Sequence, residues 1–499
     1  MGQTVGYTLP APSGGLNLID SIDNIPPTDA LELINMYPVG ARVELRGGIG
    51  EYSSITGIVK TLITFPQSDG TELLIAAANN QLRSITAGSS TDITGTAPTS
   101  DEWQHVVFNR RLFLVNGSDT GQVHTGTGSF SNMTFTGVAL SDLINVSSYK
   151  ERIYFVQKNS QSVWYGGTQS ISGALTELPV DYYLKRGGYL VACGSWSAQT
   201  GSLTEDLFYI LSSEGELLFY SGSYPGDASW RMVQRYVIGK PLGYRAKVHV
   251  ENDLWFITSR GIVPTSALFS GTSSVATNAI SRKVNQIFQA ASTGIPFSYL
   301  YNARYWSRGQ KVIIQYPTSG ANTRLLVINA ETGAWCRYIY NTSGVCLCHE
   351  IHEDKPYYGA NSGKIYLSES NRNDDDGPIP FDIRLGYNFF GDRGTYKKFR
   401  DLRPLMKTIS GITLSVSMET DFQQFPASDT ISTSSADSTP WDTSAWDTAE
   451  WPGEESYLYD RYSLSGQGHC GALRIQGSIQ DAPLEFNAFE VRFELGGQV

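Results

Sequence analysis

A two-strand pattern recurs along the middle of this 499-residue chain. Each copy has an apolar run, a short polar turn that usually contains Gly or Asn, and a second apolar or aromatic run, which is typical of a β-hairpin. The seven copies begin at Leu73, Leu112, Ile153, Leu207, Leu254, Val312 and Tyr357, at intervals of 39, 41, 54, 47, 58 and 45 residues. These intervals match the length of one four-stranded blade of a β-propeller.

The residues of these runs also favour a propeller. Several runs, such as 207–210, are apolar at consecutive positions, which suits strands that are buried on both faces. A single blade cannot bury both of its faces alone, so blades stack around an axis. We therefore predict an all-β fold with a propeller over residues 51–370, of about seven blades, although six to eight fit the spacing. An array of β-sandwiches is the alternative fold, and the one helix that we expect spans 279–291.

The two ends of the chain differ from the middle. Residues 1–50 indicate an extended arm that contributes to a platform, with at most one short helical turn at 28–36. Residues 371–380 form a polar break that predicts a solvated linker after the propeller. Residues 381–499 then predict a second β domain.

This C-terminal domain is expected to be an antiparallel, β-sandwich-like platform. Its half-buried strands are predicted by clean alternation of apolar and polar residues at 412–418, 473–477 and 489–495. A Ser/Thr/Asp-rich loop or tip is inserted at about 426–457. Three tryptophans in it would be costly if exposed, so Trp441, Trp446 and Trp451 are expected either to contact a neighbouring subunit or tail component or to cap their own domain.

Composition and charge exclude several classes of protein. Charged residues are only 17 % and hydrophobic residues 40 %, which excludes disorder throughout. The net charge of −11 argues against general attraction to phosphate or to an anionic membrane. The longest apolar stretches, such as 73–78, are too short to cross a membrane and no signal peptide is present, so we expect no membrane anchor and synthesis in the cytosol.

The five cysteines include the only metal-like cluster, Cys346-Leu-Cys348-His349 with His352. On a regular strand, Cys346, Cys348 and His352 share one face and His349 lies on the other. Structural zinc sites need a distant second pair of ligands, which the sequence lacks, so buried reduced thiols are favoured over a metal. Likewise, the run from Asn373 to Asp376 lacks the remaining spacing of a Ca²⁺ loop.

No catalytic motif is present. A phosphate-binding Gly-rich loop, a Gly-x-Ser-x-Gly elbow and His-Glu-x-x-His are all missing. The turn motif of sialidase propellers is approached only once, at 329–335. His105, His124, His249 and His469 stand alone and are interpreted as structural histidines. We therefore expect no enzyme activity and no cofactor, although a pair of glycosidase carboxylates would leave no such motif.

The ends carry a resemblance to tail proteins of short-tailed bacteriophages. The N-terminal part has a Gly-Gly-Leu-Asn start at 14–17, a Pro-Pro pair at 26–27, Asn35 ahead of Tyr37-Pro38, and an Arg46-Gly47-Gly48 strand. The segment 482–491 looks like the closing strands of such proteins. With its propeller-like middle, the whole chain is similar to the podophage tail nozzle family, also called tail tubular protein B or DNA-stabilisation protein.

This resemblance implies a structural virion protein, made in the host cytoplasm, that forms a homohexamer. The ring would lie below the portal and its adaptor ring, beside tail fibres or spikes, with the arm and the C-terminal domain as the adaptor-facing platform. It would form the distal tail channel, which retains packaged double-stranded DNA and conducts it during ejection without sequence-specific contact. An acidic channel wall would avoid ion pairs with DNA phosphates, and Asp374, Asp375 and Asp376 are the channel-lining candidates. The alternative is a carbohydrate-binding or glycan-cleaving propeller on a virion or cell surface, with Trp441, Trp446 or Trp451 stacking on sugar.

Overall fold

The computed structural model describes residues 4–200, 203–270, 279–319, 322–342, 344–409, 411–424, 427, 429–433 and 456–498. The chain folds into two compact units. The propeller unit consists of Glu51–Arg324 and Ser343–Leu367. The end unit, which carries both ends of the chain, consists of Met1–Gly50, Leu325–Thr342 and Ser368–Val499.

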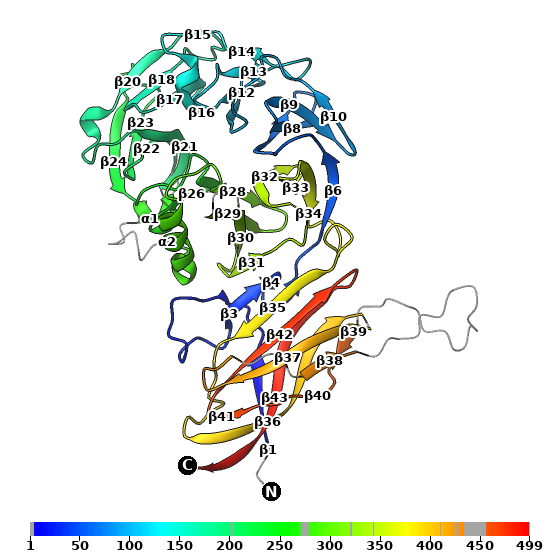
Figure 1. Ribbon diagram of the computed structural model, residues 1–499. Coiled ribbons are helices and arrows are strands. Elements are labelled where there is room, and N and C mark those ends of the chain that lie inside the picture. Colours follow the sequence, from blue (N-terminus) through cyan, green and yellow to red (C-terminus); the bar gives the residue numbers. More distant parts are fainter. Residues whose placement is uncertain are drawn as a thin grey trace. The chain divides into compact units, whose positions relative to one another are not determined.

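The described part of the propeller unit contains six separate sheets of three or four strands, and the first five are antiparallel meanders (Figure 1). The first three consist of β7 (Thr61–Pro66), β8 (Glu72–Ala78), β9 (Gln81–Thr86) and β10 (Ser89–Asp92); β11 (Gln104–Phe108), β12 (Arg111–Val115), β13 (Gln122–His124) and β14 (Ser131–Asn132); and β16 (Leu143–Tyr149), β17 (Arg152–Gln157), β18 (Ser162–Tyr165) and β20 (Thr176–Pro179). The next two consist of β21 (Leu190–Thr200), β22 (Leu203–Ser212), β23 (Glu216–Ser221) and β24 (Arg231–Val237); and β25 (Lys247–Val250), β26 (Asp253–Thr258) and β27 (Gly261–Pro264). Short β15 (Phe135–Thr136) and β19 (Gly173–Ala174) pair with each other in parallel.

The last blade joins strands that are far apart in the sequence. It consists of β32 (Cys346–His352), β33 (Lys355–Ala360), β34 (Lys364–Ser368) and, as its fourth strand, β6 (Ile49–Ser54). Between β27 and β32, the antiparallel pair β28 (Asn302–Trp306) and β29 (Lys311–Ser319) stands in the place of one further blade. The propeller architecture is therefore confirmed, and its blades fall within the expected range of six to eight.

The seven apolar runs found in the sequence are the second strands of these blades. They fall on β8, β12, β17, β22, β26, β29 and β33. In β22, the side chains of Leu207, Phe208, Tyr209 and Ile210 are at most 2 % exposed, as expected for a strand covered on both faces. The first strand of each blade lies nearer the centre of the propeller than the second strand. This follows because first strands of different blades pack beside one another: β32 beside β7, β28 beside β32, and β25 beside β28. The first strands therefore surround the propeller axis.

The helices of the propeller unit differ from the prediction. They are α1 (Thr265–Phe269), the 3₁₀ turns η1 (Leu140–Asp142), η2 (Asp181–Tyr183) and η3 (Arg282–Val284), and α2 (Asn285–Gly294). The expected helix over 279–291 therefore begins only at Asn285. The backbone before it is held to β27 instead, because the Ser281 hydroxyl accepts a hydrogen bond from the N–H of Ile262 at 2.8 Å.

The end unit is a sandwich-like pair of sheets. One contains β1 (Thr4–Pro10), β4 (Met36–Val39), β5 (Arg42–Leu45), β36 (Thr395–Thr408), β39 (Ser456–Leu458), β40 (Tyr462–Ser463), β41 (Gln467–Gly468) and β43 (Leu484–Gln498). The other contains β2 (Gly15–Leu16), β3 (Asp29–Ile34), β30 (Asn322–Asn329), β31 (Trp335–Tyr338), β35 (Ile379–Leu385), β37 (Thr413–Thr420), β38 (Asp429–Ser432) and β42 (Gly471–Ile479). Aromatic rings fill the space between them, with Phe381 and Phe486 at a centroid distance of 6.4 Å.

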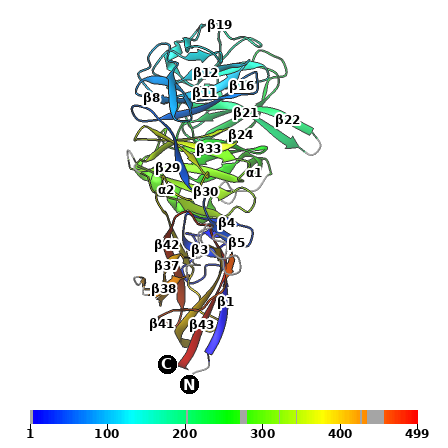
Figure 2. The same cartoon turned by 90° about the vertical axis from the view of Figure 1, so that its right-hand side faces the viewer.

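The N-terminal arm is woven into both sheets. Strand β1 pairs antiparallel with β43 from Thr4↔Glu494 to Pro10↔Ala488 (Figure 2). The helical turn expected at 28–36 is wrong, because this segment contains β3, which pairs with β35 through Leu33↔Ile383. Its Ala and Leu residues are good helix formers, but helix propensities are small in energy and sheet pairing overrides them here.

The division between the units differs from the expected domain boundaries in one segment. It falls at Gly50/Glu51 and Leu367/Ser368, close to the expected ends of the propeller. However, 325–342 leaves the propeller and belongs to the end unit. A solvated linker over 371–380 is also wrong, since Asp374 is only 1 % exposed and β35 already begins at Ile379.

Candidate functional site

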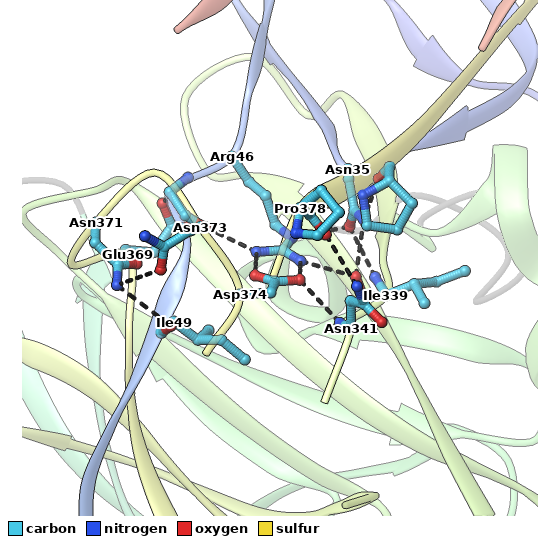
Figure 3. Close-up of polar contacts among 12 residues, drawn as sticks. Asn35, Arg46, Ile49, Ile339, Asn341, Glu369, Asn371, Asn373, Asp374 and Pro378 are labelled. Carbon is cyan, nitrogen blue, oxygen red and sulfur yellow. Dashed lines mark hydrogen bonds and ion pairs between the residues drawn. The ribbon is translucent and has the colours of Figure 1, made fainter. Parts of the chain in front are cut away.

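A buried ion pair in the end unit joins its three chain segments. The guanidinium of Arg46 binds the carboxylate of Asp374 in two places, with Nη1–Oδ1 at 2.8 Å and Nη2–Oδ2 at 2.6 Å (Figure 3). Arg46 comes from the N-terminal arm and Asp374 from the segment after the propeller. The third segment takes part as well, because Arg46 Nη2 donates to the carbonyl of Ile339 and Asp374 Oδ2 accepts the N–H of Asn341, both at 2.8 Å.

All five N–H donors of Arg46 are used. Besides the three bonds above, Nη1 donates to the carbonyl of Gly47 and Nε to Oδ1 of Asn35, each at 2.9 Å. Asn35 has a left-handed φ of 58°, which asparagine tolerates better than most residues. Its Nδ2 donates to the carbonyls of Ile339 and Pro380 at 2.8 and 2.7 Å. Asn35 therefore bridges the same segments as the ion pair.

The ion pair is fully shielded from water, since both side chains are 0 % exposed. Burial alone lowers the pKa of the Arg46 guanidinium, but the hydrogen bonds and charge of Asp374 outweigh it, so that the pKa lies above its ordinary value. The rings of Tyr340 and Tyr338 lie 4.7 and 5.7 Å from Arg46 Cζ and add cation–π contacts. An arginine this buried is tolerable only because every donor has a partner.

The two glycines after Arg46 allow the chain to approach the segment after the propeller. A Cβ on Gly48 would overlap the carbonyl oxygen of Asn373, and one on Gly47 would lie 2.6 Å from Cα of Glu369. This closeness permits a short backbone ladder, in which Gly48 N–H donates to Asn371 at 2.6 Å and Ile49 N–H to Asn373 at 2.8 Å. The Arg-Gly-Gly sequence is thus explained by this packing.

The other segments that carry the resemblance also lie in the end unit. Asn17 holds the start of the chain by donating from Nδ2 to Asp29 at 2.7 Å and to Asp20 at 2.8 Å. A Cβ on Gly15, whose φ is 79°, would collide with the backbone of Trp335. In the closing segment, Phe486 pairs with Val43. Residues from both ends therefore build one folded unit.

The three channel-lining candidates have different environments. Asp374 is wrong as a channel-lining residue, because it is buried in the ion pair with Arg46. Asp375 is half-buried and its N–H donates to the carbonyl of Ile49 at 2.8 Å. Asp376 is exposed, and its backbone carbonyl accepts a hydrogen bond from Gln480.

The Cys346, Cys348 and His352 cluster does not come together. A β-bulge between Cys346 and Cys348 shifts the side-chain alternation by one residue, so the predicted common face is wrong. Cys346 Sγ lies 3.4 Å from Nδ1 of His349, whereas Cys348 donates to the carbonyl of Val59 at 3.6 Å. His352 lies instead near Glu72, with Nδ1 3.4 Å from a carboxylate oxygen.

The electrostatics of these side chains suit a structural role. Burial raises the pKa of Cys348 to about 12 and lowers that of His349 to about 3, so both are neutral near pH 7. No group of three His, Cys, Asp or Glu side chains suited to a metal ion occurs in the described part of the chain. Trp441, Trp446 and Trp451 lie outside the described residues.

Comparison with known proteins shows likeness at the level of the fold alone. No family model and no curated protein matches the chain. Among solved structures, the chain is similar to a virginiamycin B lyase from Staphylococcus aureus (13 % identity, 65 % of this chain and 97 % of that one, TM-score 0.39) and to YCF48 from Cyanidioschyzon merolae (10 %, 64 % and 98 %, 0.40).

A third similar structure is the extracellular domain of a hybrid two-component system from B. thetaiotaomicron, at 12 % identity and a TM-score of 0.41. The match covers 64 % of this chain and only 40 % of that one, so this chain corresponds to less than half of that protein. Separately, among the described residues no helix is both long and apolar enough to cross a membrane.

Proposed function

We propose that this protein is a tail nozzle subunit of a short-tailed bacteriophage, a structural component that forms the distal DNA channel as a homohexamer. The observation that supports this most is the common location of the segments that resemble nozzle proteins. The Gly-Gly-Leu-Asn start, Asn35, the Arg46 strand and the closing segment 482–491 all belong to one sandwich. These segments come from opposite ends of the chain, yet they form one unit that is distinct from the propeller unit, which supports the proposed arm-and-platform arrangement.

The physical properties of the chain agree with this role. Packaged DNA must be retained and then released quickly, and a channel that formed many ion pairs with phosphate would slow its passage. The net charge of −11 avoids such general attraction. The ring itself would form on the symmetric adaptor, where each subunit is held at high effective concentration, so weak lateral contacts suffice.

The decisive experiment is electron microscopy of virus particles from the source culture, labelled with an antibody against this chain, with the tail symmetry determined in the same images. We expect label on a six-fold tail stub, and none with pre-immune serum. Label on peripheral fibres, or on no part of any particle, would refute the proposal. The purified chain would then be screened against glycans, which tests the alternative of a glycan-binding or glycan-cleaving propeller.

A further inference from the structure

A cavity of about 370 Å³ lies on the axis of the propeller unit, among the first strands of its blades. This volume is within the range of small-molecule sites. Strands β7, β11, β25, β28 and β32 contribute to its wall. The charged side chains that line it are Arg245, Lys247, Arg304 and Glu350.

Arg245 brings a buried charge that forms no ion pair with any carboxylate of the described residues. Its residue is only 6 % exposed. The guanidinium donates to the carbonyls of Lys60 at 2.9 Å and Trp103 at 3.0 Å, and to the hydroxyl of Thr61 at 2.5 Å. All three acceptors are uncharged, so the guanidinium of Arg245 is held in place by groups that carry no negative charge, and Glu102 acts on it only from beyond ion-pair distance.

Lys247 and Arg304 differ in their pairing. Among the described residues, no carboxylate lies within ion-pair distance of the Lys247 ammonium, which contacts the neutral side chain of Tyr209 by a hydrogen bond and with Nζ 5.6 Å from the ring centroid. Arg304, in contrast, binds Glu350 through Nη2 at 3.1 Å and Nε at 3.2 Å. The four charged side chains therefore leave two net positive charges in the cavity of a chain whose own net charge is −11.

Two histidines in the same wall do not change this balance. Burial lowers the pKa of His105 to about 4, Glu350 opposes the shift, and Arg304, Arg245 and Lys247 all add to it. Burial also lowers the pKa of His249. Both rings are neutral near pH 7, where each can still donate one N–H to a ligand.

We propose that the axial cavity binds a small oxyanion, a phosphate or carboxylate group that takes Lys247 as its ionic partner beside the fixed charge of Arg245. An anion there compensates charges that the fold leaves unpaired, in a site partly withdrawn from water where such pairing is strong. The site involves only the propeller unit and does not depend on the proposed nozzle function.

The test is isothermal titration of the full chain with inorganic phosphate at constant ionic strength, and separately with glucuronate and with neutral glucose. Phosphate or glucuronate should bind and glucose should not; the tighter of the two anions identifies a phosphate or a carboxylate ligand. K247Q should weaken binding of that anion by about tenfold or more, which is the scale of one lost ionic contact. E350Q should strengthen it, because it removes the one negative charge of the cavity.

The matched control is K240Q, because Lys240 is 63 % exposed and pairs with Glu214 outside the cavity. The affinity of K240Q for the anion should equal that of the unmodified chain. A thermal scan of each variant establishes that the variant is folded. Arg245 is left unchanged because it holds the backbone of β7. No binding of either anion at about 10 mM, or equal affinities for K247Q and K240Q, would overturn the proposal.

Discussion

Arg46 and Asp374 are 328 positions apart in the sequence, and they form a bidentate ion pair with no exposure to water. Removing one partner of such a pair leaves the other charge buried without compensation. The stability of the end unit therefore depends on a contact between the N-terminal arm and a segment that follows the whole propeller.

The first prediction concerns this pair. R46A should lower the opening free energy of the end unit by about 3–5 kcal/mol, because Asp374 is left buried and unpaired. Hydrogen exchange measured by mass spectrometry on peptides from β3 and β43 reports this loss, while peptides from β22 should be unchanged. R400A is the control, because the exposed pair of Arg400 and Glu494 contributes at most about 1 kcal/mol. Equal losses in the two variants would contradict the prediction.

The second prediction concerns the close approach at Gly48. G48A should destabilise the end unit by about 1–3 kcal/mol, because the new methyl group overlaps the carbonyl of Asn373. The control G50A should have little effect, because a Cβ there is 3.4 Å from its nearest neighbour, Nδ2 of Asn371. Exchange rates of peptides over 371–376 measure both. If the G48A chain were as stable as the G50A chain, the strand that contains Gly48 and residues 371–376 would separate without loss of stability, which would contradict the prediction.

The third prediction concerns acid sensitivity of the propeller unit. The pKa of His349 is lowered by burial to about 3, so the unfolded state binds more protons than the folded state between that value and the ordinary pKa near 6.5. The contribution of neutral His349 to the free energy of unfolding is therefore fully present above pH 6.5. It falls as the pH drops, by about 1.4 kcal/mol per pH unit. Urea unfolding at pH 6, 5 and 4 gives the free energy of unfolding at each pH. This free energy should fall less steeply with decreasing pH in H349Q than in the unmodified chain. H469Q, a change in the end unit, should leave the pH dependence of the propeller's unfolding free energy unchanged.

The fourth prediction concerns thiol reactivity. All five cysteines are buried, and burial raises the pKa of Cys348 to about 12 and that of Cys193 to about 11. Because the thiolate is the reactive form, Ellman's reagent should react with essentially no thiol of the folded chain over several minutes. In guanidinium chloride all five should react. Rapid reaction of a thiol in the folded chain would show that its blade or sheet opens readily.

The repeat in the sequence predicted the propeller because one strand in each blade is buried on both faces. The apolar runs of β8, β22 and the other second strands carry that signal. The first strands carry little of it, since residues such as Lys247 and Arg304 face the axial cavity and interrupt their apolar pattern. For this reason the axial cavity could not be found from periodicity.

The candidate sites were less predictable, because they depend on pairing that the sequence does not encode locally. The acidic residues around Asp374 predict a solvated segment, because the sequence does not show that Arg46 lies beside Asp374. The bulge between Cys346 and Cys348 likewise changes which side chains share a face, and the identities of these two residues do not predict a bulge. The segment 325–342 follows a blade strand without a break, so its membership of the end unit follows only from its contacts with residues such as Gly15 and Asn35.

The closure of the last blade by β6 has a consequence for synthesis on the ribosome. Strand β6 is made near the start of translation, and its partner β34 begins at Lys364, about 300 residues later. At about 5–20 residues per second, that interval lasts roughly 15–60 seconds. During this time β6 is an unpaired strand with its hydrogen-bonding edge open, a template for wrong pairing with other nascent chains. The propeller can close only when nearly three quarters of the chain has been made, so its yield should depend on how well that early strand is protected.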